Sequence, residues 1–362
     1  MKTTLDLCGS GFLRVAVPCL HLLLAVGASA QTFTTFDAPG AGTGIDEGTI
    51  PYSINSAGVI AGYFFGIGGY AHGFARAVDG TISEFNAPGV YPFGTFALSV
   101  TTGGAITGEI DSPEAHHGFE LVNGTMTTFD APGAGITAPQ SINPGGIISG
   151  YVLFTTNVFH GFVRAADNTI TVFDVPGAGG GVDQGTLAYS INSAGAIAGF
   201  YLDANNVDHG FVRAADGTMT LFDAPGAGTG ANQGTEAYSI NSSGAITGWY
   251  IDANAVYHGF MRAAGGTITT FDAPGAGTGT GLGTFPYSIN AGGTIVGSVL
   301  DASTVFHGFV RTASGSITTF EAPGSGTGSD QGTSATSINA GGTIAGDYID
   351  SNQVWHGFVR TP

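Results

Sequence analysis

A five-residue motif, His-Gly-Phe-Val-Arg, recurs along the chain and constrains the fold more than any other feature. Full or close copies begin at His72, His117, His160, His209, His258, His307 and His356. The last four copies lie 49 residues apart. A unit of this length cannot bury its apolar face alone, so the copies are expected to pack against one another.

Two further markers recur seven times in a fixed order with this motif. Phe-Asp-Ala-Pro-Gly or a variant begins at Phe36, Phe85, Phe129, Phe173, Phe222, Phe271 and Phe320. Ser-Ile-Asn begins at Ser53, Ser141, Ser190, Ser239, Ser288 and Ser337, and Ser99-Val100-Thr101 is its divergent copy. The chain therefore contains seven related repeats.

Each repeat is predicted to hold four short strands. In the copy from Glu236 to Asp272 these are residues 236–241, 245–251, 256–263 and 267–272, separated by turns rich in Gly, Asp and Asn. Gly265-Gly266 is predicted to be a two-residue hairpin turn. With that turn, Phe260 would lie opposite Phe271, as a cross-strand aromatic pair that stabilises the sheet.

Seven units of four antiparallel strands predict an all-β fold, a seven-bladed β-propeller. After residue 30 the chain begins with an isolated fourth strand, residues 32–36, and it ends just after a third strand at Arg360. Pairing of this N-terminal strand with the last blade would close the ring and leave no open edge. A linear solenoid is the alternative, but its ends should carry caps.

The repeat resembles the bacterial HAF extracellular repeats, named for His-Ala-Phe. The resemblance rests on Ser-Ile-Asn-x-x-Gly-x-Ile-x-Gly followed by His-Gly-Phe-Val-Arg, and it covers nearly all of residues 31–362. The middle residue is Gly here instead of Ala. The resemblance implies export and a propeller-like repeat fold, and it implies no catalytic residues.

The first 30 residues have the pattern of a signal peptide. Lys2 and Arg14 precede an apolar run, residues 15–26, and Ala28-Ser29-Ala30 predicts cleavage before Gln31. A membrane anchor is the alternative, but the run is too short to span a hydrocarbon core of about 30 Å. We expect a secreted or periplasmic monomer, residues 31–362, with one domain and no membrane insertion after cleavage.

Cysteine content and charge narrow the classes of partner. Both cysteines, Cys8 and Cys19, lie in the predicted signal peptide, so the exported chain would fold without disulfides. The net charge is -18, and no lysine follows Lys2. Nucleic acid is excluded as a partner, because such a chain repels a polyanion and has no basic stripe.

The histidines and arginines of the motif are candidates for either function or structure. The arginines occupy one repeat position, at Arg76, Arg164, Arg213, Arg262, Arg311 and Arg360, and the second repeat has Leu121 there. A ring of histidines could line the axis and bind a metal or an anion. We favour a structural role, with His bonded to a backbone group and Arg paired with an acidic residue, because a metal needs three or four convergent ligands.

No cofactor or metal is predicted. Three Asp-x-Asn turns resemble the start of a calcium loop and make calcium the lesser alternative; they are Asp203–Asn205, Asp252–Asn254 and Asp350–Asn352. The later Gly and bidentate Glu of an EF-hand are missing. We therefore favour ordinary turns, in which the Asp and Asn side chains bond to the nearby backbone, over a calcium site.

A departure from the repeat points to a candidate ligand site. The marker Phe precedes the next marker Ser by 17 residues in five repeats, but by 14 from Phe85 and by 12 from Phe129. These shorter loops would leave a notch. The same region holds atypical residues that could bind a ligand: Tyr91, Phe93, His116 and Glu120. The alternative is neutral drift of surface loops.

The sequence favours a secreted scaffold that binds a protein or a glycan, since no catalytic constellation is recognisable in it. The alternative is an extracellular carbohydrate-active enzyme, a lyase or hydrolase with its site at one axial face. That enzyme would need one blade to contribute a singular acid, base or metal set. A purely structural envelope protein is a third class.

Overall fold

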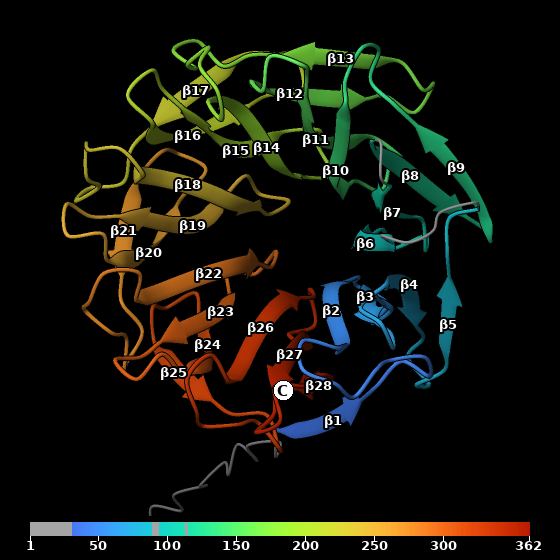
Figure 1. Ribbon diagram of the computed structural model, residues 1–362. Helices are drawn as coiled ribbons and strands as arrows, with labels where there is room; N and C mark the ends of the chain where they lie inside the picture. The colour runs from blue at the N-terminus through green and yellow to red at the C-terminus, as the bar shows by residue number, and fades with distance from the viewer. Residues whose placement is uncertain (1–30, 89–93, 113–114) are drawn as a thin grey trace, which may run out of the picture. The chain divides into compact units, whose positions relative to one another are not determined.

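The computed structural model describes residues 31–88, 94–112 and 115–362, which form strands and turns. Twenty-eight strands are hydrogen-bonded into one closed sheet system (Figure 1). Among the described residues, no helix is long and apolar enough to cross a membrane. The predicted signal peptide, residues 1–30, lies outside the described residues and stays a prediction, and Tyr91 and Phe93 lie outside them as well.

The first and second strands of each repeat lie nearest the axis of the ring (Figure 1). The first strands are β2 (Gly48–Ile54), β6 (Gly94–Val100), β10 (Ile136–Ile142), β14 (Gly185–Ile191), β18 (Gln233–Ile240), β22 (Gly283–Ile289) and β26 (Gly332–Ile338). The second strands are β3 (Ile60–Phe65), β7 (Ile106–Asp111), β11 (Ile148–Leu153), β15 (Ile197–Leu202), β19 (Ile246–Ile251), β23 (Ile295–Leu300) and β27 (Ile344–Ile349).

The third and fourth strands lie farther out. The third strands carry the His-Gly-Phe motif: β4 (Ala71–Arg76), β8 (His116–Val122), β12 (Phe159–Arg164), β16 (Val207–Arg213), β20 (Tyr257–Arg262), β24 (Phe306–Arg311) and β28 (Trp355–Thr361). The fourth strands are β5 (Ile82–Phe85), β9 (Thr125–Phe129), β13 (Ile170–Phe173), β17 (Met219–Phe222), β21 (Ile268–Phe271), β25 (Ile317–Phe320) and, at the N-terminal end, β1 (Thr32–Phe36).

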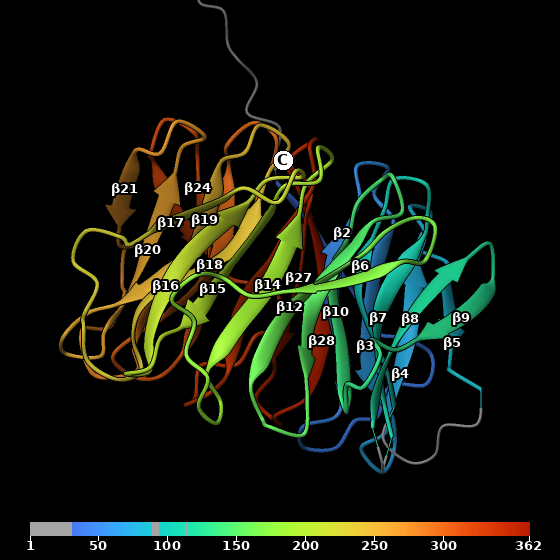
Figure 2. The same ribbon diagram turned by 90° about the horizontal axis from the view of Figure 1, so that it is seen from above.

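Closure of the ring depends on the N-terminal strand. β1 pairs antiparallel with β28, with Thr32 opposite Thr361 and Phe36 opposite Gly357. The prediction of an all-β repeat fold closed by this strand is confirmed. The strands run between two faces (Figure 2). We call the end at which the third strands begin the His face and the end at which they finish, near Arg360, the Arg face.

Phenylalanines join neighbouring repeats. Each Phe at the end of a fourth strand contacts the motif Phe of the next third strand, with ring centroids 6.0–6.4 Å apart; the pairs are Phe36–Phe74, Phe85–Phe119, Phe129–Phe162, Phe173–Phe211, Phe222–Phe260, Phe271–Phe309 and Phe320–Phe358. Every motif Phe is fully buried. Such an aromatic pair contributes about 0.5–1.5 kcal/mol beyond its area burial.

The predicted cross-strand pair of Phe260 and Phe271 is wrong by one residue. Phe271 lies opposite Gly259, and Phe260 lies opposite Thr270. The turn is longer than two residues, because Ala263 N–H donates to the carbonyl of Thr267 and Gly266 N–H donates to the carbonyl of Ala263. This turn shifts the register, so the aromatic contact forms between repeats and not within one sheet.

The shifted register explains the glycine of the motif. A Cβ at Gly259 would lie 2.7 Å from ring atoms of Phe271 and 2.9 Å from Cγ of Pro286. The ring of the fourth-strand Phe therefore occupies the space that a side chain would need.

Serine and asparagine of the Ser-Ile-Asn marker tie the first strands together around the axis. Each Ser Oγ accepts a hydrogen bond of 3.2–3.4 Å from a backbone N–H of the next repeat, and Ser337 closes this ring on Ile54. Six Asn side chains donate to a carbonyl of the next repeat, and Asn339 closes on Asn55. Thr101 has no amide for this second contact.

We predict that Gly259→Ala lowers the free energy of unfolding by about 2 kcal/mol, because overpacking of this size forces a shift of Phe271 or of backbone. Chemical denaturation followed by circular dichroism measures the change. Gly265→Ala is the matched control, since a Cβ there meets no atom within 4 Å. Equal stability of the two variants would contradict the role assigned to the motif glycine.

Candidate functional site in the axial pocket

The motif histidines bond to side chains. Nδ1 of each ring faces the residue after the marker Phe, 2.5–2.9 Å away, in the pairs His72–Asn86, His117–Asp130, His160–Asp174, His209–Asp223, His258–Asp272, His307–Glu321 and His356–Asp37. The expected backbone partner is therefore replaced by an acid or amide side chain. These contacts fix the turn that follows each fourth strand at the His face.

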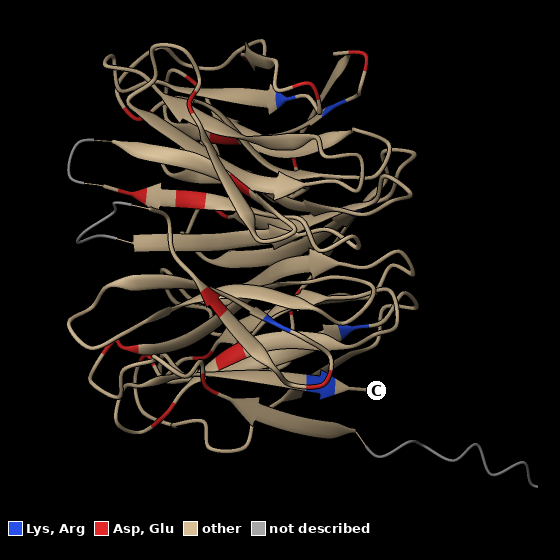
Figure 3. Cartoon of the chain, turned by 90° about the vertical axis from the view of Figure 1, so that its right-hand side faces the viewer, with Lys and Arg blue, Asp and Glu red and all other residues tan. Residues whose placement is uncertain are grey.

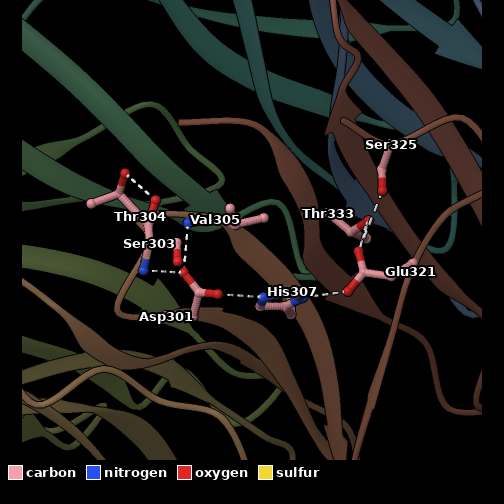
Figure 4. Close-up of polar contacts among 8 residues, drawn as sticks. All are labelled: Asp301, Ser303, Thr304, Val305, His307, Glu321, Ser325 and Thr333. Atoms are coloured by element: carbon pink, nitrogen blue, oxygen red, sulfur yellow. Dashed lines mark hydrogen bonds and ion pairs between the residues drawn. The ribbon is translucent and has the colours of Figure 1, made fainter. Parts of the chain in front are cut away.

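In some repeats the histidine lies between two carboxylates. Figure 4 shows His307 between Glu321 and Asp301, whose Oδ2 lies 3.3 Å from Nε2. Burial lowers the pKa of His307, but the hydrogen bonds with Glu321 and Asp301 outweigh it and leave the pKa raised. The hydrogen bond with Asp37 raises the pKa of His356. These histidines stabilise the fold in their charged form.

The motif arginines stack on aromatic rings. Each guanidinium lies 4.6–4.9 Å from the centre of a fourth-strand Phe ring of the preceding repeat, in the pairs Arg76–Phe36, Arg164–Phe129, Arg213–Phe173, Arg262–Phe222, Arg311–Phe271 and Arg360–Phe320. Figure 3 places the arginines toward the end that carries the C-terminus. The expected pairing of Arg with an acidic residue is observed for Arg164, which bonds to Glu120, whereas the acid of Phe-Asp-Ala bonds to His.

The described residues of the predicted notch do not converge. His116 begins β8 and faces Glu109 and Asp111, with 3.1 Å between Nε2 and Asp111 Oδ1. Glu120 bonds Nη1 of Arg164 in the next repeat at 3.0 Å. His116 and Glu120 are four residues apart on one strand, about 13 Å, so one small ligand does not contact both through short side chains.

The Asp-x-Asn turns are satisfied by the chain itself. Oδ1 of Asp203 accepts hydrogen bonds from the backbone N–H groups of Asn205 (2.7 Å) and Val207 (2.9 Å), and the turns at Asp252 and Asp350 repeat this pattern. In the part of the chain that the structure describes, no group of three or more His, Cys, Asp or Glu side chains could hold a metal ion.

A pocket of about 460 Å³ lies on the axis, and all seven first strands line it. The seven marker serines form one layer, and the residues before them form another: Tyr52, Leu98, Gln140, Tyr189, Tyr238, Tyr287 and Thr336. Toward the His face the lining extends along the strands of the last repeat, where it includes Gly332, Ser334, Asp347, Ile349 and Trp355, and it also includes Phe306 on β24 of the sixth repeat.

Small side chains open the pocket in the last repeat. Ser334 stands at a first-strand position that holds Ile50, Phe96, Leu187 or Phe285 in other repeats. Thr336 replaces the Tyr found in four repeats, and Asp347 replaces a second-strand aromatic such as Tyr63 or Trp249. Loss of this bulk leaves a space that the neighbouring repeats fill with rings.

Asp347 is the chemically distinctive group of the pocket. Its side chain is only 3% exposed and lies on β27, directly across from Ser334 on β26. Burial raises its pKa to about 8. Neither Asp347 nor the Ser334 hydroxyl forms a side-chain hydrogen bond with any described residue, whereas the Thr336 hydroxyl donates to the carbonyl of Pro51 at 2.8 Å. Buried polar groups are normally satisfied, so an unpaired carboxyl that lines a cavity indicates a place for a ligand.

Two more carboxyls, Asp208 on β16 and Glu236 on β18, are close enough for the charge of one to act on the other. Burial, and then the nearby charge of Glu236, raise the pKa of Asp208 to about 8. Burial raises the pKa of Glu236 to about 7. Neither residue lines the axial pocket.

Sequence reasoning missed Ser334, Thr336 and Asp347. The signal was present, because Thr-Ser-Ile-Asn stands in the last repeat where Tyr-Ser-Ile-Asn is usual. Its meaning depended on the register that sets Ser334 opposite Asp347 and on the closure that brings the last repeat against the first.

No protein-family model matches the chain, and no curated protein matches it. Among solved structures it is similar to AofleA from Arthrobotrys oligospora, with 11% identity, coverage of 82% of this chain and 91% of that one, and a TM-score of 0.46. It is also similar to a variant of the Aleuria aurantia lectin in complex with Fucalpha1-6GlcNAc, with 12% identity, 79% and 96% coverage and a TM-score of 0.45.

A further similar structure is TolB from Acinetobacter baumannii, with 13% identity, coverage of 67% of this chain and 57% of that one, and a TM-score of 0.44. Likeness at these scores carries no inference about a ligand of this chain. The resemblance to HAF repeats stays a prediction.

We predict that Asp347→Asn stabilises the protein in a pH-dependent way. The folded-state pKa lies above the ordinary value of an aspartic acid, 3.8, so the folded state loses stability as the pH rises from about 3.8 toward 8. Asparagine does not ionise, so the variant does not lose this stability. The melting temperature of the variant should exceed that of the wild type by about 5 °C at alkaline pH and by much less near pH 4.

Thermal denaturation at both pH values measures this difference. Asp216→Asn, an exposed acid in a turn, is the control and should show no gain at alkaline pH. A gain for Asp347→Asn that does not change with pH would refute the assignment of a protonated Asp347.

Proposed function

We propose that the protein is an exported, seven-bladed β-propeller that binds a glycan in its axial pocket. The blade count is supported by seven repeats of one antiparallel strand pattern, first to fourth, that closes through β1 and β28. Export is supported by the signal-peptide pattern of residues 1–30. We propose a monomer, because β1 leaves no unpaired edge at the seam.

The pocket itself is the observation that carries the proposal. Its volume of about 460 Å³ lies in the range of small-molecule sites, roughly 300–1,000 Å³. Hydroxyl groups and aromatic rings dominate its lining, and Trp355 and Phe306 stand beside Ser334 and Asp347. Sugars offer both chemistries, since their hydroxyls bond to polar groups and their C–H faces pack on rings.

The constant frame around a varied pocket supports a binding role. Serine, asparagine and phenylalanine contacts recur in the repeats and build the ring. Three positions that line the pocket in the last repeat, Ser334, Asp347 and Trp355, hold different residues in other repeats. A scaffold of this kind holds a singular site without loss of its frame.

Charge narrows the class of glycan. The net charge is -18, and among the described residues no Lys, Arg or His lines the pocket. A sulfated or uronic glycan would meet repulsion from this field. Neutral or cationic sugars fit the pocket.

A carbohydrate-active enzyme is the second candidate function, and the Asp208–Glu236 pair favours it. Two nearby carboxyls with pKa values displaced by burial are the groups that glycoside hydrolysis uses. Release of new reducing ends from a glycan panel, lost in both Asp208→Asn and Glu236→Gln, would establish this activity in place of simple binding.

We predict that Ser334→Phe abolishes glycan binding by filling the pocket with the ring that Phe285 provides one repeat earlier. A panel of mono- and disaccharides, titrated by calorimetry, measures the loss, which should exceed tenfold in affinity. Leu187→Phe, at the same strand position in another repeat and outside the pocket lining, is the control and should bind normally.

Circular dichroism separates loss of the pocket from loss of the fold. Both variants should keep the wild-type spectrum. A folded Ser334→Phe protein that binds sugars with unchanged affinity would exclude the axial pocket as the binding site.

A further inference from the structure

We propose that the axial pocket selects an amino sugar, whose primary ammonium group is bound by Asp347 and Ser334 while its ring packs against Trp355. This inference rests on the proposed glycan-binding function and names the chemical class of the ligand.

The hydrogen-bonding groups of Asp347 and Ser334 suit an ammonium group. Asp347 and Ser334 face each other across β26 and β27, and neither forms a side-chain hydrogen bond with a described residue. An ammonium group has three N–H donors and no acceptor, so it fits a carboxylate and a hydroxyl oxygen that both lack donors. A neutral hydroxyl would satisfy only part of this set.

The electrostatic surroundings of Asp347 favour a cationic ligand. None of the described side chains that line the pocket is basic, so none of them provides Asp347 with a cationic partner there. The aromatic rings of Phe306 and Trp355 line the same end. The face of an aromatic ring attracts a cation, and this attraction strengthens where water is excluded. The carboxyl and the rings therefore favour the same charge.

Binding of the cation has a defined proton balance. Titratable groups of the neighbouring elements are Tyr52 on β2, Tyr63 on β3 and Tyr287 on β22, and burial raises the pKa of each. These phenols stay neutral near pH 7. A bound ammonium lowers the pKa of Asp347, which then ionises and releases its proton to solvent. The bound ammonium group replaces the proton that Asp347 releases, so the net charge of the pocket with its ligand does not change.

Contact with the ring of Trp355 makes the pocket specific for a sugar over a small amine. Trp355 lines the axial pocket and also the adjacent hollow formed with Ile50, Tyr63 and Phe65. A sugar whose ammonium group lies at Asp347 can extend past this ring toward the His face. A small amine without a ring would lack this contact.

Calorimetric titration of the full chain with glucosamine, N-acetylglucosamine, glucose and ethylamine tests the inference. Glucosamine should bind at least tenfold more tightly than each of the other three, since charge-assisted hydrogen bonds are roughly twice as strong as neutral ones. Asp347→Asn should remove this preference and bind glucosamine and glucose alike. Asp216→Asn, an exposed acid outside the pocket lining, should keep the preference.

The outcomes separate the inference from the proposed function. Equal affinity of the wild type for glucosamine and glucose would overturn the amino-sugar inference and leave the glycan pocket standing. Equal affinity for ethylamine and glucosamine would overturn it as well, because the ring would then contribute nothing. Failure of all three sugars to bind would overturn the inference and count against the glycan pocket, which the wider saccharide panel tests independently.

Discussion

The packing of one phenylalanine between two repeats is the interaction on which the structure depends. The fourth-strand Phe lies over the glycine of its own third strand, contacts the motif Phe of the next repeat, and stacks against an arginine of that repeat. For Phe222 these three partners are Gly210, Phe260 and Arg262. One ring thus links three residues of the repeat signature. Because β1 supplies Phe36 to the last sheet, the same contact also closes the circle.

Much of the fold was predictable because the signature residues perform the same task seven times. Repetition identified the strands, and the N-terminal strand 32–36 matches β1 residue for residue. The register was not predictable, because Gly265 and Gly266 allow two turn types that differ by one residue in pairing. The shifted register also sets Asp272 opposite His258, which therefore bonds to this acid. Arg262 lies against Phe222 of the preceding repeat, a contact between repeats that pairing within one hairpin does not reveal.

The candidate site was harder to predict than the fold. Loop length drew attention to His116 and Glu120, which bond to Glu109 and Arg164, whereas the axial pocket shows as departures from the repeat within the strands. The pocket arises from three small or acidic substitutions on two adjacent strands, Ser334, Thr336 and Asp347. These residues form one pocket only in the folded ring, after strand pairing and ring closure place them on one side of the axis.

In the proposed account, the constant contacts between repeats form a scaffold and the axial pocket of the described residues forms the site. A crystal structure of the protein soaked with glucosamine tests this division most directly. The account predicts a sugar beside Trp355 with its nitrogen within hydrogen-bond distance of Asp347 and Ser334. A sugar bound at the outer edge between repeats, with the axial pocket filled only by water, would contradict it.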